Sequence, residues 1–473
     1  MSIGSILNMA REGMRAQQTV INTASQNIAN AQTEGYSRQR VELQAALPTV
    51  FPYGSVGTGV NIAGITRARD ALLDMAYRAD TSAAASAQTR NAALTQVQSV
   101  FGEPSDTGLS AALDAFWSSW SDLAGDPTNA AAKSVVRQAG LNVSTTLNRF
   151  AAQLDQLDQF NREGMNADVN AANALAKNIA AINIRVVSAE SNGQPANDLR
   201  DQRDLMLDQL SQLVGGQTVE HADGSVAYYV GGRLLVDGTN VKTLQMNDGQ
   251  PPTVTLPDNA YPIDGIGGTV GGRIQVSATD IPMVMSKLDA IAKGLVEQVN
   301  AIHTTGETYS GNPPVAAPAG NFFDITVPPP AGTDPLLTAR NIRLAPTMTG
   351  PNAVAASAAA TGPGNNAIAT ALAALRDSAV SLTASNGTTT ATFNTYFNET
   401  VGALATEVRQ SGDEATVQNT LASQAETRRQ SVSGVSTDEE LITVIEHQHA
   451  YQAAARLVTV VDEMAETLIN LGL

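Results

Sequence analysis

The N-terminal stretch of the chain carries a long apolar seam with helical spacing. Apolar residues recur there at alternating steps of four and three, and Gln17 is the one polar residue in the row. The row consists of Ile3, Leu7, Ala10, Met14, Gln17, Ile21, Ala24, Ile28 and Ala31. This is the heptad pattern of a helix that packs against other helices. Thr33, Glu34 and Gly35 follow it and predict the end of the helix.

The C-terminal stretch has a second seam of the same spacing. Residues 437–440 form a capping box, which predicts that a helix begins there. The seam behind the box is polar only at His447. It consists of Val444, His447, Tyr451, Ala454, Val458, Val461, Ala465 and Leu468. Leu457, Met464 and Leu471 widen the apolar face beyond the single stripe that a surface helix needs. Both ends are therefore expected to pair with helices of other chains; an antiparallel pair within one domain is the simpler alternative.

The first half of the middle region is mostly helical in pattern. Glycines space the apolar residues between positions 56 and 65, which predicts a twisted hairpin or ribbon. Helical periodicity then extends from about residue 70 to residue 213, with turn signals at 103–106 and 125–127. The last helix of this stretch is expected to begin near Asn197.

The second half of the middle region mixes strands, loops and helices. Short apolar runs separated by Gly-Gly and Asp-Gly predict hairpins from residue 215 to about residue 276. A helix is expected over residues 281–302, and residues 306–363, rich in Pro, Gly and Ala, predict loops with a few strands. Helical periodicity returns near Ala367 and continues to the C-terminus, with one polar break at residues 385–388.

This order predicts an α+β multidomain fold in which the chain runs out along a rod and back again. Long coiled-coil termini and a helical bundle would enclose a nested, mainly β outer insert. The expected domains are a terminal coiled-coil assembly domain (1–60 and 431–473), a helical rod domain (61–214, 277–305 and 364–430) and a β-rich outer domain (215–276 and 306–363).

Composition narrows the classes of partner. The 473 residues include 45 Asp and Glu against 28 Lys and Arg, so the chain carries a formal charge of −17 and repels phosphate backbones and anionic membranes. It has no cysteine, which excludes disulfides and thiolate chemistry. No run approaches the roughly 18 apolar residues of a membrane span. The N-terminus has no basic region or cleavage site of a standard secretory signal, so the chain is expected to be cytosolic or exported by another route.

Candidate catalytic and metal-binding groups do not form working sites. His447 and His449 lie two apart, so on a helix they point about 200° away from each other and cannot share a ligand sphere. Four aspartates recur three or four residues apart beside Arg200 and Arg203, and we expect local ion pairs on a solvated face. They are Asp198, Asp201, Asp204 and Asp208. We therefore expect no enzyme, no metal and no cofactor.

The end of the N-terminal seam carries a recognisable signature. Residues 27–36 include Asn27-Ile28-Ala29-Asn30, then Thr33, Gly35 and Tyr36. They resemble the signature of the bacterial flagellar axial proteins, whose usual form is Asn-Ile-Ala-Asn-x-x-Thr-Pro-Gly-Tyr. Glu34 stands where the family often has Pro.

The continuation of this signature, residues 37–39 (Ser-Arg-Gln), is similar to one branch of the family, the proteins at the junction between flagellar hook and filament. Further segments that resemble this branch are 56–70, 126–135, 197–204 and 433–440.

The resemblance implies a structural protein that polymerises at the hook tip as a junction ring joining hook to filament. Family members leave the cytoplasm unfolded through a specialised export channel, so this chain is expected to be secreted and extracellular, in the flagellum. The implied partners are further copies of the chain, the hook protein, a second junction protein and a cytoplasmic export chaperone on the C-terminal helix. Neither nucleic acid nor membrane is expected as a partner.

Two groups of residues are predicted to carry this function. The assembly surface is expected to comprise Ile3, Leu7, Met14, Ile21, Ile28, Tyr451, Val458, Val461, Leu468 and Leu471. The bend out of the inner helix is expected to be shaped by Asn27, Asn30, Gly35 and Tyr36. Two alternatives stay open: another axial component of the hook or distal rod, and an adhesin-like binding module in the outer insert.

Overall fold

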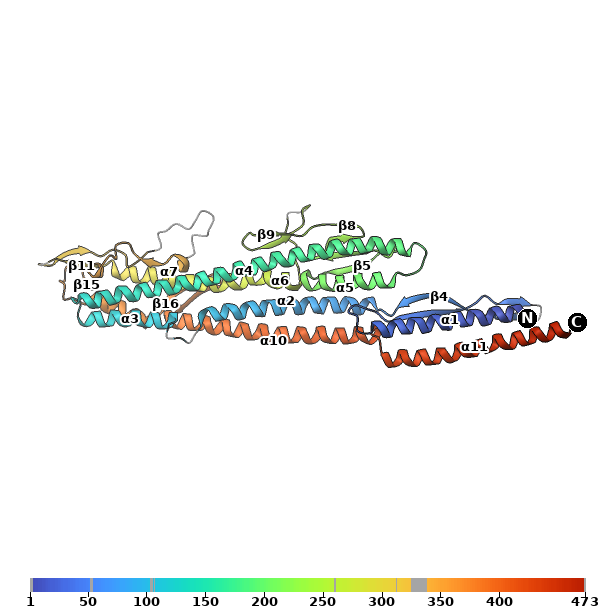
Figure 1. The fold of residues 1–473 in the computed structure, drawn as a ribbon. Helices are drawn as coiled ribbons and strands as arrows, with labels where there is room; N and C mark the ends of the chain where they lie inside the picture. Colours follow the sequence, from blue (N-terminus) through green and yellow to red (C-terminus); the bar gives the residue numbers. More distant parts are fainter. Residues whose placement is uncertain are drawn as a thin grey trace.

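The molecule is elongated, and both chain ends lie at the same end of it (Figure 1). The structure is a computed structural model, and it describes residues 3–51, 54–102, 105, 107–258, 261–311, 313–324 and 338–471. The chain runs away from the N-terminus, forms the body of the rod and returns, as the nested order of elements predicted.

The terminal helices pair with each other. Helix α1 (Ile3–Asn30) packs along α11 (Thr437–Leu471), and the two run antiparallel (Figure 1). Both helices were predicted, but the capping box at 437–440 is wrong by one residue. The backbone N–H of Glu439 donates to the Ser436 hydroxyl at 3.4 Å, whereas the Glu440 carboxylate is used in contacts with other parts of the chain. We call this pair, together with the ribbon described next, the terminal module.

A β ribbon lies on α1, on the side away from α11 (Figure 1). Strand β1 (Gln39–Ala45) pairs antiparallel with β4 (Val60–Arg67), and β2 (Thr49–Phe51) pairs with β3 (Gly54–Val56) nearer the tip. A bulge interrupts the β1–β4 register after Glu42. Residues 39–67 are called the ribbon below. The predicted hairpin over 56–65 is its returning half.

The rod is built on long helices. They are α2 (Ala71–Phe101), α3 (Leu109–Gly125), α4 (Ala130–Glu190), α5 (Asn197–Val214) and α10 (Phe393–Ser433). Their breaks fall where the turn signals predicted them. Side-chain caps fix two of the starts: Asp70 accepts from the Leu72 N–H at 2.8 Å, and Asn129 accepts from the Ala131 N–H at 2.9 Å. Helix α10 packs along α2, which brings the returning chain beside the outgoing one.

One buried apolar cluster, here the proximal core, lies toward the terminal module. It joins the C-terminal half of α4 and helix α5 to a four-stranded antiparallel sheet. The sheet order is β5 (Gln217–Glu220), β6 (Val226–Val230), β7 (Arg233–Asp237) and β8 (Asn240–Val241). Strands β9 (Gln245–Asn247) and β10 (Thr253–Thr255) form a separate pair.

The predicted end of this β region is wrong. A helix already begins at Gly268: α6 (Gly268–Gln275) passes through a π-helical segment (Val276–Asp280) into α7 (Ile281–His303). Its glycines obscured the helical pattern, because glycine disfavours helix interiors. They are there for close packing: a Cβ at Gly272 would lie 2.5 Å from the Ser86 carbonyl oxygen on α2.

The second buried cluster, the distal core, fills the other end of the rod. It contains α3, the first part of α4, α7 and α9 (Ala367–Ala373), with an aromatic group that includes Trp117, Trp120, Phe322 and Phe323. Several short elements surround it, including a three-stranded sheet in the order β12-β11-β15. These elements are β11 (Gly306–Ser310), β12 (Val315–Pro318), β13 (Phe323–Asp324), α8 (Thr338–Asn341), β14 (Arg343–Leu344), β15 (Ser357–Ala358), β16 (Val380–Ala384) and β17 (Gly387–Ala391).

The architecture is an α+β multidomain fold, as predicted. The three-domain division itself stays a proposal, and one observation stands against part of it. Apart from Val276, the described residues of 215–276 and of 306–363, which that division joins in one outer domain, pack into different cores and form different sheets. Within the described part of the chain, no helix combines the length and the hydropathy needed to cross a bilayer.

Candidate assembly surface and joint

Most of the sequence signatures converge in space, whereas residues 126–135 lie beside the distal core. Residues 27–39, the end of β4, the start of α5 and the start of α11 meet where the terminal module joins the rod. Among the side chains that the structure describes, none of α1 or α11 belongs to either buried core, so polar contacts dominate this connection. We call it the joint.

Asn27 lies at the centre of the joint and is fully buried. Its side-chain Nδ2 donates to the Gln39 carbonyl at 2.9 Å and to the Glu440 carboxylate at 3.0 Å. Its Oδ1 accepts from the Tyr36 hydroxyl at 2.9 Å and from the Gln39 N–H at 3.0 Å. Asn27 therefore ties the end of α1 both to the first strand of the ribbon and to the start of α11.

The other predicted bend residues lie in the same turn. Asn30 donates from Nδ2 to the Gln26 carbonyl at 3.0 Å and accepts from the Thr33 hydroxyl at 3.2 Å. Gly35 has a φ of +78°, and a Cβ there would lie 3.1 Å from the Cβ of Leu205 on α5. The positive φ favours glycine, and a Cβ there would also be tight against Leu205. Burial raises the pKa of Tyr36 to about 12, and nearby carboxylates add to this rise.

Each residue of the Ser-Arg-Gln continuation has its own partner. Ser37 donates through its backbone N–H and its hydroxyl to Asp201, at 3.0 and 2.6 Å. Arg38 donates from Nε to Glu440 at 2.6 Å and from Nη1 to Glu439 at 3.0 Å. The Gln39 side chain donates to Asp198 at 3.1 Å. This segment thus links the end of α1 to both α5 and α11.

The aspartates of α5 correct the sequence interpretation. Asp201, Asp204 and Asp208 are buried rather than solvated, and Asp198 alone of the four is exposed. Their ionic partners lie far away in the sequence. These partners are Arg67 at the end of the ribbon, Arg69, Arg78 on α2 and Arg429 on α10.

Two of these carboxylates bridge several elements. Asp204 accepts from Arg67 at 2.7 Å and also pairs with Arg69 and with Arg78. Asp208 accepts from Arg78 at 2.6 Å and from Arg429 at 2.6 Å. Burial alone would raise the pKa of Asp204, but the surrounding guanidinium groups outweigh it and hold that pKa well below its ordinary range.

A polar cavity of about 760 Å³ opens beside this network. Turn residues 31–36, α5, and the end of α10 with the link into α11 line it. The guanidinium carbon of Arg429 lies 3.7 Å from the centre of the Tyr77 ring within the lining. The joint is therefore a connection made by hydrogen bonds and ion pairs, and it surrounds a polar cavity.

The predicted assembly residues lie along the α1–α11 pair. The five on α1 are all half-buried, Val458 is half-buried, Val461 is buried and Tyr451 is exposed. The side chains of Leu468 and Leu471 lie outside the part of the chain that the structure describes. The two polar interruptions of the seams meet: His447 Nδ1 is hydrogen-bonded to Gln17 Oε1. A polar pair in an otherwise apolar seam fixes the register of two helices.

A second apolar face of α11 stays open and was only partly recognised from the sequence. We call it the outward face of α11; it comprises Leu441, Ile442, Ile445, Leu457, Val460 and Met464, and each is at least half exposed. The sequence pattern includes Leu457 and Met464 in the widened apolar stripe, but it does not tell which side of the helix meets α1.

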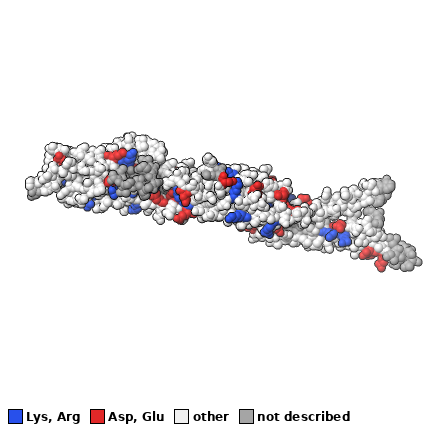
Figure 2. All heavy atoms as spheres, turned by 90° about the horizontal axis from the view of Figure 1, so that it is seen from above, with Lys and Arg blue, Asp and Glu red and all other residues white. Residues whose placement is uncertain are grey.

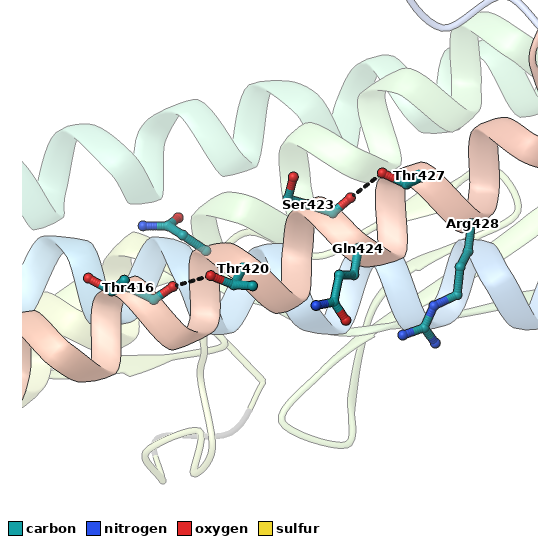
Figure 3. Close-up of a pocket in the computed structure, with 7 residues that line it drawn as sticks. Thr416, Thr420, Ser423, Gln424, Thr427 and Arg428 are labelled. Carbon is teal, nitrogen blue, oxygen red and sulfur yellow. Dashed lines mark hydrogen bonds between the residues drawn. The ribbon is translucent and has the colours of Figure 1, made fainter.

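Other surfaces offer little chemistry. Figure 2 shows one face on which cations and anions are interspersed and most of the surface is uncharged. A trough of about 630 Å³ on α10 is lined by polar residues (Figure 3). Two of its hydroxyls, those of Thr420 and Thr427, are turned back onto carbonyls of their own helix at 2.8 and 2.9 Å. Among the described residues, no group of three or more His, Cys, Asp or Glu side chains is placed to hold a metal ion.

Comparison with known proteins first identifies the class. Residues 7–36 match the model described as "Flagella basal body rod protein", and residues 428–471 match "Flagellar basal body rod FlgEFG protein C-terminal". Both ends of the chain, which form the terminal module and reach the joint, therefore have the sequence character of flagellar axial proteins.

The middle of the chain identifies the family. Residues 94–323 match "Flagellar hook-associated protein FlgK helical domain". Flagellar hook-associated protein 1 of Bacillus subtilis is 30% identical, over 98% of this chain and 97% of that protein. The protein of the same name from Salmonella typhimurium is 27% identical, over 69% of this chain and 60% of its own length. The chain belongs to the flagellar hook-associated protein 1 family.

A solved structure shares the fold. The flagellar hook junction protein FlgK from Burkholderia pseudomallei superposes with a TM-score of 0.64 at 17% sequence identity. The match covers 76% of this chain and all of that one.

Proposed function

We propose that this chain is a structural subunit of the bacterial flagellum that polymerises at the hook tip as a junction ring joining hook to filament. The alignment with the Bacillus subtilis relative carries the proposal, because it spans nearly all of both chains. The relatives bear the names of flagellar components, and we assign this chain a structural rather than an enzymatic role.

The proposed partners follow from that role. They are other copies of the chain within the ring, the hook protein on one side and a second junction protein on the other. A cytoplasmic chaperone would hold the C-terminal helix before export, and the chain would reach the cell exterior through the flagellar export channel. The outward face of α11 supports this part of the proposal, since large exposed apolar surfaces mark sites of association.

The residues predicted from the sequence keep distinct proposed roles. The apolar seam between α1 and α11 would hold the terminal module together, and its half-buried residues would also contact neighbouring copies. The bend residues Asn27, Asn30, Gly35 and Tyr36 would fix the direction in which the module leaves the rod. The bonds from Asn27 to both the ribbon and α11 support this second role.

Electron microscopy of cells that lack this chain tests the proposal, combined with a blot for flagellin in the medium. Complete hooks without filaments, with flagellin lost to the medium, are the expected result, and the wild-type gene supplied in trans should restore the filaments. Normal filaments in the deletion strain would refute the junction role. Missing hooks would instead assign the chain to the rod or the hook.

A further inference from the structure

The two outer sides of the terminal module are unlike, and we propose that they bind each other between neighbouring copies. The ribbon of one copy packs against the outward face of α11 of the next copy. This inference rests on the proposed function and identifies the contact through which successive subunits join.

The ribbon side is apolar and exposed. The sequence has no charged residue between Glu42 and Arg67. Leu47 is 89% exposed and Val50 is 78% exposed, while Leu43 and Ile62 are opposite each other across the strands and each is 40% exposed. An exposed apolar ribbon of this kind is unfavourable in water unless a partner covers it.

The outward face of α11 is the matching helical surface. Ile442, at 64%, is its most exposed member, and Leu457, Val460 and Met464 continue the face toward the C-terminus. The spacing of these residues places them along one side of the helix. They form two patches, residues 441–445 and 457–464, because the exposed His449 and Arg456 lie between them on the same side.

Helix α1 lies between these two surfaces. It packs against the ribbon on one side and against α11 on the other (Figure 1). One chain therefore cannot bring its own ribbon onto its own outward face. A contact between two different surfaces of identical subunits is heterologous, and it continues from copy to copy into a ring or a helical assembly.

Charge selects this pairing over a symmetric one. Helix α11 contains seven acidic residues and one arginine. Six of the acidic residues are exposed: Asp438, Glu439, Glu446, Asp462, Glu463 and Glu466. Two α11 helices packed face to face would bring these carboxylates together, which is costly. The ribbon and α1 carry the exposed cations Arg40, Arg11 and Arg15 with Glu42 and Glu12 beside them, so they do not share the net negative charge of α11.

The register of the terminal pair indicates the height of the contact. Gln17 is hydrogen-bonded to His447, so in an antiparallel pair Met9 lies level with Ala455, about half a turn before Leu457. Gly59 of the ribbon approaches Met9, since a Cβ there would lie 3.1 Å from Met9 Cγ. Thr58, next to Gly59, donates its hydroxyl to the Leu47 carbonyl, so neighbours packed at equal height would bring Leu47 near Leu457.

Cysteine cross-linking tests the contact, and the chain has no cysteine of its own. Three double variants carry Leu47→Cys together with Ile442→Cys, Leu457→Cys or Met464→Cys. Flagella isolated from cells that produce each variant are oxidised and analysed on denaturing gels. A control carries Leu47→Cys with Val417→Cys, which is exposed on α10 of the rod.

The expected result is a ladder of dimers, trimers and larger species for at least one double variant, most strongly with Leu457→Cys. Each single variant and the control should remain monomeric. A dimer from Leu457→Cys alone would show α11 facing α11 and overturn the proposal. The absence of a ladder from all three pairs, with the chain present in the flagella by blot, would overturn it while leaving the junction role intact. Absence of the cysteine-free chain from flagella would instead refute the proposed function on which it rests.

Discussion

Two adjacent glutamates in the joint offer a controlled test of what holds the terminal module in place. Glu440 accepts from Asn27 at 3.0 Å and from Arg38 at 2.6 Å, and only 4% of its side chain is exposed. Glu439 accepts from the same arginine at 3.0 Å, but 63% of its side chain is exposed. Glu440→Ala and Glu439→Ala therefore remove the same charge from neighbouring positions and differ in burial.

The expected free-energy costs of the two substitutions differ, because a buried group that loses its partner cannot form a hydrogen bond to water instead. Loss of one partner from a buried ion pair costs about 3–5 kcal/mol. Glu440→Ala leaves the Arg38 Nε and part of the Asn27 amide unsatisfied, so we expect the joint to open more easily by that amount. An exposed pair contributes about 0–1 kcal/mol, which sets the expectation for Glu439→Ala.

Amide hydrogen exchange measures this opening directly. The Gln39 N–H, bonded to Asn27, and the Arg38 N–H, bonded to the Ser433 carbonyl at 2.9 Å, report on the joint. In Glu440→Ala their exchange should accelerate roughly a hundredfold to a few thousandfold, since each 1.4 kcal/mol is a factor of ten. Amides of the two cores should not change. Equal acceleration in both variants, or faster exchange throughout the cores, would refute the argument from burial.

Three further predictions concern the rod. Burial lowers the pKa of His303 from its ordinary 6.5 to about 4. The stabilising contribution of the neutral imidazole is therefore complete above pH 6.5 and is lost as the pH falls toward 4. The free energy of unfolding of the wild type should fall by about 3 kcal/mol over this range, a loss that His303→Gln should lack. Gly272→Ala should lower the free energy of unfolding, measured in urea, by about 1–3 kcal/mol, because the added Cβ meets the Ser86 backbone. The control Gly402→Ala places its Cβ in open space and should raise the free energy of unfolding by about 0.5–1 kcal/mol. Asp204→Asn should cost about 3–5 kcal/mol by the same measurement, and a change within 1 kcal/mol would contradict the bridging role of that carboxylate.

Local patterns in the sequence predicted the helices well and predicted their packing poorly. The heptad seams identified α1 and α11, and turn signals identified the breaks around α3. These features depend on residues a few positions apart. The helix at Gly268 was missed because its glycines serve contact with α2, a requirement that is visible only once α2 lies beside it.

The joint shows the same limit more sharply. Asp201 and Asp204 have arginines nearby on their own helix, and local pairing was the natural expectation. Their actual partner Arg67 lies more than 130 residues earlier in the chain. Spacing within one helix cannot reveal such a pair. The one available signal was that residues 37–39, 56–70, 197–204 and 433–440 resembled the same branch, and these segments meet at the joint. Residues 126–135 also resembled that branch but lie beside the distal core.

Helix α4 has a mechanical consequence for the whole molecule. Its 61 residues extend about 90 Å, and they contribute to the distal core at one end and to the proximal core at the other. A load applied along the rod thus passes through one continuous hydrogen-bonded backbone rather than through a loop between two bodies. The long helix acts as a strut that resists stretching and bending, and compliance is concentrated where polar contacts connect the rod to the terminal module.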